Sequence, residues 1–312
     1  MKIHSGLSDF KAHRPVVTIG MFDGLHMGHR QLLQQLVSCA RERDGESVVL
    51  TFWPHPRIVL NNDPESLRFL TSLEEKTRLF SELEIDHLVI IPFTLDLAAL
   101  TARQFTHQVL VGHIGMVHVV VGFNHRFGSD SRAVLPDYEG MGQEMGFGVT
   151  RVGAVSFCDL KASSTAIRNL LNKGNVEDAA RLLTYPYRLT GRVVGGNRMG
   201  RTIQYPTANI EVEDPLKLIP AVGVYACRVM VMGRHYGGMM NIGFRPTLQS
   251  AVAVKTIEVH LFDFSGDIYS EEIVVEFIYR IRNEVQFAGL GALKAQLSED
   301  EKVARELLAG YE

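Results

Sequence analysis

Two histidines and an arginine stand close together near the start of the chain: His26, His29 and Arg30. Residues three apart share one face of a helix, so the two imidazoles can point at a common ligand. A phosphate suits two imidazoles beside a guanidinium, because each can offer it a hydrogen bond. The alternative is that both histidines are surface or helix-capping residues, and spacing alone leaves both interpretations open.

A strand, a turn and a helix must position these side chains. Residues 16–19 are all β-branched, which is typical of a buried strand. Gly20 and Gly24 break that strand, and apolar residues at helical spacing follow from residue 32 to residue 40. The helix is predicted to begin near Gly28. Its first turn lacks an acid, although free N–H groups at a helix start favour anions. The segment therefore predicts a phosphate site.

A second acid-free helix start is predicted at Ser163, Ser164 and Thr165. Serine is a favourable N-cap, and residues 161–175 contain no aspartate or glutamate. Arg168 lies just inside this helix, so a second phosphate site is predicted. The alternative is an ordinary capped helix with a surface arginine.

Strand and helix patterns alternate through the first half of the chain. Such alternation predicts a doubly wound α/β domain, a parallel sheet with helices on both faces. Ligands bind beyond the carboxyl ends of the strands in such sheets. We therefore expect residues 20–29, 53–56 and 122–128 to converge on one site. The strands are expected at residues 16–19, 47–53, 87–91 and 117–121.

The pattern changes after Pro186 to short alternating strands with glycine turns, which is typical of a small β-barrel. The expected domains are residues 1–184 and 185–312, the second ending in a helix at 290–308. Ser298 and Glu301 have the spacing of a capping box, which predicts a helix start inside that last segment.

A glycine-rich segment, GGNRMGRT at residues 195–202, nearly matches a P-loop. A P-loop must open a helix, and Pro206 follows too closely for that. A flap that binds phosphate through backbone N–H groups and guanidinium groups is the better interpretation. Its candidate residues are Gly195, Arg198, Gly200 and Arg201.

Three polar residues on predicted barrel strands could serve phosphoryl transfer. Thr207 and Asn209 are two apart, so on a strand both face one side and could form part of an oxygen shell for Mg²⁺. Glu258 lies in the alternating segment 256–261 and could accept a hydroxyl proton as a general base. The alternative is that all three residues simply lie on the solvent-exposed face of an amphipathic strand.

The composition narrows the possible partners. A length of 312 residues suits about two domains. The net charge of −3 argues against a nucleic-acid partner, and no apolar run is long enough for a membrane span. The three cysteines form no CxxC pair, which favours a reduced, cytoplasmic compartment and argues against structural zinc. We expect a monomer or a weak homo-oligomer.

The motifs of the first half resemble a known family. HMGH at residues 26–29, after FDG, is similar to the signature of the nucleotidylyltransferase superfamily. Together with VVGFNHRFG at 120–128 and SSTAIR at 163–168, it resembles the adenylyltransferase half of bacterial bifunctional riboflavin kinase/FAD synthetases. The resemblance implies that His26, His29, Ser163, Ser164 and Arg168 hold ATP phosphates and that Asn124 lies near the reacting phosphates. The other candidate ATP contacts are Gly20, Phe22, Asp23, Gly24, Gly28 and Thr165.

The second half resembles the riboflavin kinase module of the same family, through residues 191–210, 241–248 and 257–263. The resemblance implies that Thr207 and Asn209 coordinate Mg-ATP and that Glu258 is the catalytic base. The sequence departs from the family at His125, where an aromatic residue is usual, at residues 129–133, and at Gln204, where glycine is usual.

The expected function is therefore synthesis of FMN from riboflavin and ATP, followed by transfer of AMP from a second ATP to FMN, giving FAD and pyrophosphate. Mg²⁺ is the expected cofactor. One alternative keeps the kinase but has a weak or inactive N-terminal module, and another is a non-catalytic flavin sensor. The candidate flavin contacts, for which core packing is an equal alternative, are Trp53, Pro54, Pro56, Phe123 and Phe127.

Overall fold

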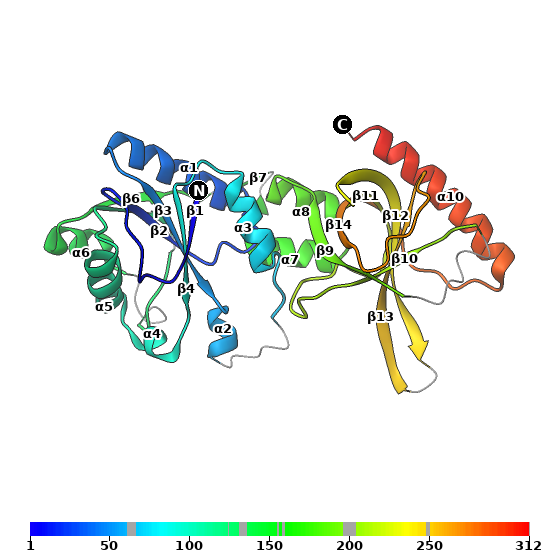
Figure 1. Ribbon diagram of the computed structural model, residues 1–312, viewed down its shortest axis with the longest axis horizontal. Coiled ribbons are helices and arrows are strands. Elements are labelled where there is room, and N and C mark those ends of the chain that lie inside the picture. Colours follow the sequence, from blue (N-terminus) through cyan, green and yellow to red (C-terminus); the bar gives the residue numbers. More distant parts are fainter. Residues whose placement is uncertain are drawn as a thin grey trace. The chain divides into compact units, whose positions relative to one another are not determined.

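The computed structural model describes residues 1–60, 67–123, 125–130, 136–154, 156–157, 160–195, 204–247 and 250–311. The chain forms two compact units, Met1–Ser164 and Thr165–Glu312, which are described separately below (Figure 1). No helix among these described residues is long and apolar enough to cross a membrane.

A six-stranded parallel sheet is the centre of the first unit, in the order β1-β4-β3-β2-β5-β6. The predicted parallel sheet is confirmed, and β1 and β6 extend it at its two edges. The strands are β1 (Lys2–Ser5), β2 (Val16–Ile19), β3 (Ser47–Trp53), β4 (His87–Pro92), β5 (His118–Gly122) and β6 (Gly148–Val152). A short hairpin, β7 (Ser156–Phe157) and β8 (Leu160–Lys161), stands apart from it.

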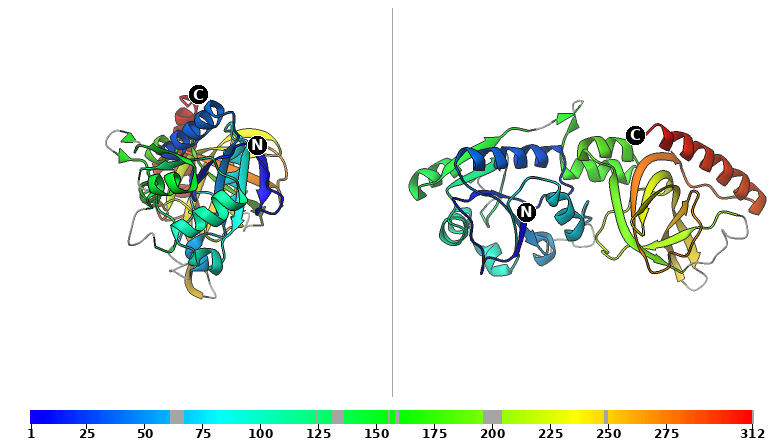
Figure 2. Two further views of the ribbon diagram at one scale, coloured as in Figure 1. Left: turned by 90° about the vertical axis from the view of Figure 1, so that its left-hand side faces the viewer. Right: turned by 45° about the horizontal axis from the view of Figure 1, so that its top comes forward.

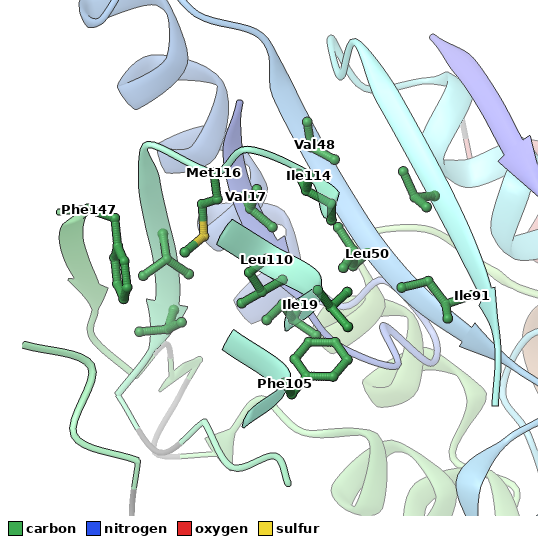
Figure 3. Packing of buried hydrophobic residues seen from close by; sticks show 14 of the residues in the cluster. Val17, Ile19, Val48, Leu50, Ile91, Phe105, Leu110, Ile114, Met116 and Phe147 are labelled. Atoms are coloured by element: carbon green, nitrogen blue, oxygen red, sulfur yellow. The ribbon is translucent and has the colours of Figure 1, made fainter. Parts of the chain in front are cut away.

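Helices cover both faces of this sheet (Figures 1 and 2). Alternate strand residues such as Val17, Ile19 and Leu50 pack against Phe105 and Leu110, as Figure 3 shows. The helix of α1 (Met27–Glu42) contacts β2, β3, β5 and β6. The remaining helical segments are α2 (Pro56–Val59), α3 (Leu73–Ser81), α4 (Leu95–Ala99), α5 (Ala102–Phe105), the π-helix η1 (Thr106–His113) and α6 (Tyr138–Met145).

The strand order reverses at β2, which lies between β3 and β5. All four residues of β2 pair with β3. Among the described residues, only Val16 and Val17 of β2 pair with β5, opposite His118 and Val119. The two strands therefore separate towards their carboxyl ends. Such a switch point is where open α/β sheets bind ligands.

The second unit contains a closed antiparallel barrel in the order β10-β13-β12-β11-β14-β9, which confirms the predicted barrel. Helices α7 (Ser164–Asn172) and α8 (Val176–Leu183) precede it, and α8 packs on β9 and β14. The strands are β9 (Tyr187–Val194), β10 (Ala208–Glu211), β11 (Gly223–Val231), β12 (Arg234–Thr247), β13 (Ser250–Leu261) and β14 (Glu272–Arg282).

A terminal helix, α10 (Leu290–Ala309), lies along the outside of the barrel (Figure 2). Its Ala304 is buried with Ala226 and Met239 of the barrel. Its Asp300 accepts hydrogen bonds of 2.6 and 2.8 Å from the Arg282 guanidinium. The helix is continuous through Ser298, so the helix start predicted there is wrong. The apolar face that packs on the barrel already begins before that residue, at Leu297.

Candidate active sites

The turn between β2 and α1 has an unusual backbone. Phe22 and Leu25 have φ values of 49° and 33°, in the left-handed region that side chains seldom adopt. Such conformations cost of order 1–3 kcal/mol and persist where the surroundings enforce them, commonly at functional sites. Here the buried Phe22 ring packs edge-on against His29, with ring centroids 5.3 Å apart. Phe22 thus acts on the site through His29.

Asp23 fastens this turn to the segment before α3. Its carboxylate accepts hydrogen bonds from the backbone N–H groups of Leu70 and Thr71 and from the Thr71 hydroxyl, at 3.0–3.2 Å. The Thr71 hydroxyl in turn accepts a hydrogen bond from the Gly24 N–H. Asp23 is buried, so its main role in this structure is to hold the turn.

His26 is the N-cap of α1. Its Nδ1 accepts a hydrogen bond of 3.4 Å from the His29 N–H. In the neutral ring the proton must then be on Nε2, which makes Nε2 the N–H donor of the ring. The His29 ring stacks on the His26 ring, with ring centroids 3.7 Å apart. A Cβ at position 28 would lie only 3.3 Å from the His26 ring, which explains the use of Gly28.

Both histidines are neutral near pH 7. Burial lowers the pKa of His26 to about 4, an effect that Asp23 partly opposes. Burial also lowers the pKa of His29 well below its ordinary value, and electrostatic interactions with His26 and Lys76 lower it further. The phosphate site predicted here therefore offers neutral hydrogen-bond donors and a helix N-terminus rather than two cations.

Lys76 of α3 is a charged residue near this site that sequence reasoning missed. It is buried, and burial lowers its pKa to about 8, while Asp23 acts in the opposite direction. One signal was present: Lys76 occupies the same helix face as Leu79 and Phe80, where a core residue is expected. A lysine on an apolar face needs a partner, and the Asp23 charge provides one.

One residue of the second predicted helix start, Ser164, contacts the turn before α1. Ser164, the first residue of α7, donates a hydrogen bond of 2.9 Å from its hydroxyl to the Asp23 carbonyl. Ser163 precedes it directly. Thr165 and Arg168 belong to the second unit, so their contribution to this phosphate site stays a prediction. Both α1 and α7 lack an acid in the first turn, as the sequence predicted.

The candidate flavin contacts follow β3 and β5, the strands on either side of β2. Trp53 ends β3, and its ring lies 6.1 Å from that of Phe69. Phe123 follows β5, is 42% exposed and carries the Lys161 ammonium 4.3 Å above its ring. Phe127 packs against Phe105 at the edge of the core. Exposure favours Phe123 over Phe127 as a stacking surface. Pro56 is the first residue of α2, and Pro54 precedes the N-cap residue of that helix.

The candidate kinase residues meet on the barrel. Thr207 donates a hydrogen bond of 3.1 Å from its hydroxyl to a Glu258 carboxylate oxygen. Asn209 of β10 is paired with Glu258 of β13, and Asn241 of β12 is paired with Glu258 on its other side. The neighbouring Val259 is buried, so Glu258 lies on the opposite, outer face. Glu258 is thus flanked by polar residues of the two strands that pair with β13, and Thr207 contacts its carboxylate.

Two contacts hold the chain before β10. His260 Nδ1 lies 2.8 Å from the Pro206 carbonyl, next to Thr207. Gln204 has a φ of 70° and accepts a hydrogen bond of 2.9 Å from Lys294. A positive φ explains why glycine is usual there, since only glycine adopts it without strain.

Several predicted residues lie outside the described part of the chain. These are Asn124, Arg198, Gly200 and Arg201. Gly195, which follows β9, is described.

Comparison with known proteins identifies the family. The FAD synthetase family model matches residues 9–166, and the riboflavin kinase family model matches residues 183–308. A bifunctional riboflavin kinase/FMN adenylyltransferase of Listeria monocytogenes is 36% identical over 95% of this chain and 93% of its own. One of Escherichia coli K12 is 40% identical over 93% and 92%. The chain belongs to the bifunctional riboflavin kinase/FMN adenylyltransferase family.

The fold agrees with this membership. A solved structure from Streptococcus pneumoniae, described as a macrolide-efflux protein, is 32% identical with a TM-score of 0.88 over 97% of this chain and 98% of its own. Both parts of the family layout, the parallel α/β unit and the barrel with its terminal helix, are present here. The two family matches leave residues 167–182 between them, and the functional boundary at 184/185 stays a prediction.

Proposed function

We propose that this chain phosphorylates riboflavin with ATP to give FMN and then adenylylates FMN with a second ATP to give FAD and pyrophosphate. The observation that carries the proposal is that each unit has its own phosphate-directed site. One is the helix start capped by His26, and the other is the Thr207–Glu258 pair on the barrel. The names of the relatives point to the same two reactions.

In the kinase step, Glu258 accepts the proton of the riboflavin 5′-hydroxyl. The hydroxyl oxygen forms a bond to the γ-phosphorus of ATP as the bond to the bridging oxygen breaks, and ADP leaves. Positioning and charge neutralisation supply most of the catalysis in such transfers. Thr207 keeps Glu258 in place through its hydrogen bond until substrate arrives.

Mg²⁺ is the cofactor that we propose for this step. The donor set fits it, because Thr207, Asn209 and Glu258 supply only oxygen ligands from neighbouring positions. Thr207 and Asn209 would hold the ion, which neutralises phosphate charge when bound. Glu258 remains available for the hydroxyl proton.

In the adenylyl step, a phosphate oxygen of FMN forms a bond to the α-phosphorus of ATP, and pyrophosphate leaves. No protein nucleophile is needed. His26 donates from Nε2–H to a phosphate oxygen, and the helix N-terminus of α1 stabilises the charge on the leaving group. Arg168 is proposed to contact the triphosphate from α7.

The alternative with an inactive N-terminal module is not favoured, because the FAD synthetase match covers that module and its two histidines are present. A non-catalytic flavin sensor would not need the Thr207–Glu258 pair. We further propose a cytoplasmic location, where ATP is available and the buried thiols of Cys39 and Cys227 stay reduced. A monomer or weak homo-oligomer stays a prediction.

The proposal is tested by incubating the purified full chain with riboflavin, ATP and Mg²⁺ and separating the flavins over time. FMN should form first and FAD should follow, with one ADP and one pyrophosphate per FAD. Formation of FMN without FAD, also when FMN is supplied, would support the kinase-only alternative. Binding of riboflavin without any product would support the sensor.

A further inference from the structure

His125 joins the two strands that separate at the switch point. The described pairing between β2 and β5 ends at Val17 and Val119, two residues before the end of β2. His125 follows β5, and its ring forms a hydrogen bond with the backbone of Ile19, the last residue of β2. Its Nδ1 lies 2.5 Å from the Tyr138 hydroxyl of α6. The ring therefore bridges a gap that the sheet itself leaves open.

The two hydrogen bonds fix which nitrogen carries the proton. A backbone carbonyl can only accept, so the ring nitrogen facing Ile19 must donate. Burial lowers the pKa of His125 to about 4, so the ring is neutral and has one N–H group. Nδ1 is then the acceptor, and the Tyr138 hydroxyl donates to it. Burial also raises the pKa of Tyr138, which keeps that hydroxyl protonated.

Tyr138, the hydrogen-bond partner of His125, is itself fixed by its neighbours. The Tyr138 side chain is buried, and the Arg151 guanidinium of β6 lies 5.6 Å from its ring centroid. Arg151 forms a two-fold ion pair with Glu139. The Phe127 ring stacks on the His125 ring, with centroids 5.7 Å apart, and lies at the same distance from the Tyr138 ring. The bridge thus runs from β6 through α6 to the end of β2.

His125 lies between two segments that carry candidate residues for adenylyl transfer. Ile19 is followed by the turn that ends in His26, and His125 itself lies two residues after Phe123. We propose that His125 is a positioning residue for adenylyl transfer, whose two hydrogen bonds set the distance between the β2 turn and the end of β5. The inference rests on the proposed adenylyl transfer.

The test compares three variants of the full chain. His125→Phe keeps a ring of similar size but removes both hydrogen bonds. His125→Gln keeps an amide N–H near the nitrogen that faces Ile19. Tyr138→Phe removes only the hydroxyl. The initial rate of FAD formation from FMN and ATP is measured at saturating substrate, with the KM for ATP. Riboflavin phosphorylation and urea unfolding followed by the Trp53 fluorescence are the controls.

His125→Phe should lower kcat for FAD formation at least about tenfold, because small misplacements of reacting groups can cost up to ~10²-fold. The KM for ATP and the rate of FMN formation should change less than about twofold, and His125→Gln should recover part of the lost kcat. Tyr138→Phe should also lower kcat, and it provides the test if His125→Phe does not fold.

Two results would overturn the inference: an unchanged kcat in His125→Phe or Tyr138→Phe, or equal losses in His125→Phe and His125→Gln, which would indicate packing alone. A wild-type chain that makes no FAD from FMN would instead refute the proposed function.

Discussion

Replacing His26 by asparagine is expected to make the first unit less sensitive to acid. Asparagine is a favourable N-cap, so the variant keeps an oxygen acceptor for the His29 N–H at the start of α1. It cannot be protonated, whereas His26 can. The difference between the two proteins therefore reports the titration of the His26 imidazole together with its influence on the stacked His29.

The magnitude follows from the pKa of His26. In the folded unit it is about 4, against 6.5 for an ordinary histidine. The unfolded chain thus binds more protons between these pH values. The contribution of His26 to the free energy of unfolding is therefore complete above about pH 6.5 and decreases as the pH drops towards 4. The complete contribution of His26 to the free energy of unfolding is about 3 kcal/mol, and about 2 kcal/mol of this contribution is lost between pH 7.5 and pH 5.

Urea unfolding at several pH values measures this difference. Trp53 is the single tryptophan of the chain, so its fluorescence reports the first unit. His107→Asn, at an exposed histidine of η1, is the matched control and should follow the wild type. The reasoning is refuted if His26→Asn loses as much stability as the wild type between pH 7.5 and pH 5.

Three further changes test other parts of the structure. His29→Ala should lower FAD formation from FMN by about 10²–10³-fold and leave riboflavin phosphorylation intact, because it removes a transition-state donor; equal rates in a coupled pyrophosphate assay would contradict this. Thr207→Ala should raise the Mg²⁺ concentration needed for half-maximal FMN formation, and an unchanged Mg²⁺ titration would argue against a ligand role. Asp300→Ala leaves Arg282 without its carboxylate partner and should destabilise the barrel by about 3–5 kcal/mol, measured by calorimetry. An unchanged barrel transition would mean that α10 is held by its apolar face alone.

The sequence predicted the elements of the sites well, because periodicity and helix-start residues are local signals. The strand at Val16–Ile19 and the acid-free start of the helix that follows it are both confirmed. The outward face of Glu258 also followed from alternation, because Val259 beside it is buried.

The contacts between elements could not be predicted in this way. Asp23 is fastened to Thr71, 48 residues away, and Ser164 reaches the Asp23 carbonyl from 141 residues away. Strand alternation fixes a face but not a register, so the pairing of Glu258 with Asn241 was missed. The protonation state of His26 likewise depends on burial, which the whole fold decides.

The central claim is that one chain carries two separate active sites, and Glu258→Gln tests it most directly. The substitution keeps the size of the side chain and removes the base. One preparation of the variant is assayed for riboflavin phosphorylation and for FAD formation from supplied FMN, both at saturating substrate and Mg-ATP. We predict that FMN formation falls by roughly 10²–10⁴-fold while FAD formation keeps the wild-type rate. An undiminished rate of FMN formation, or a parallel loss of both reactions, would contradict the account.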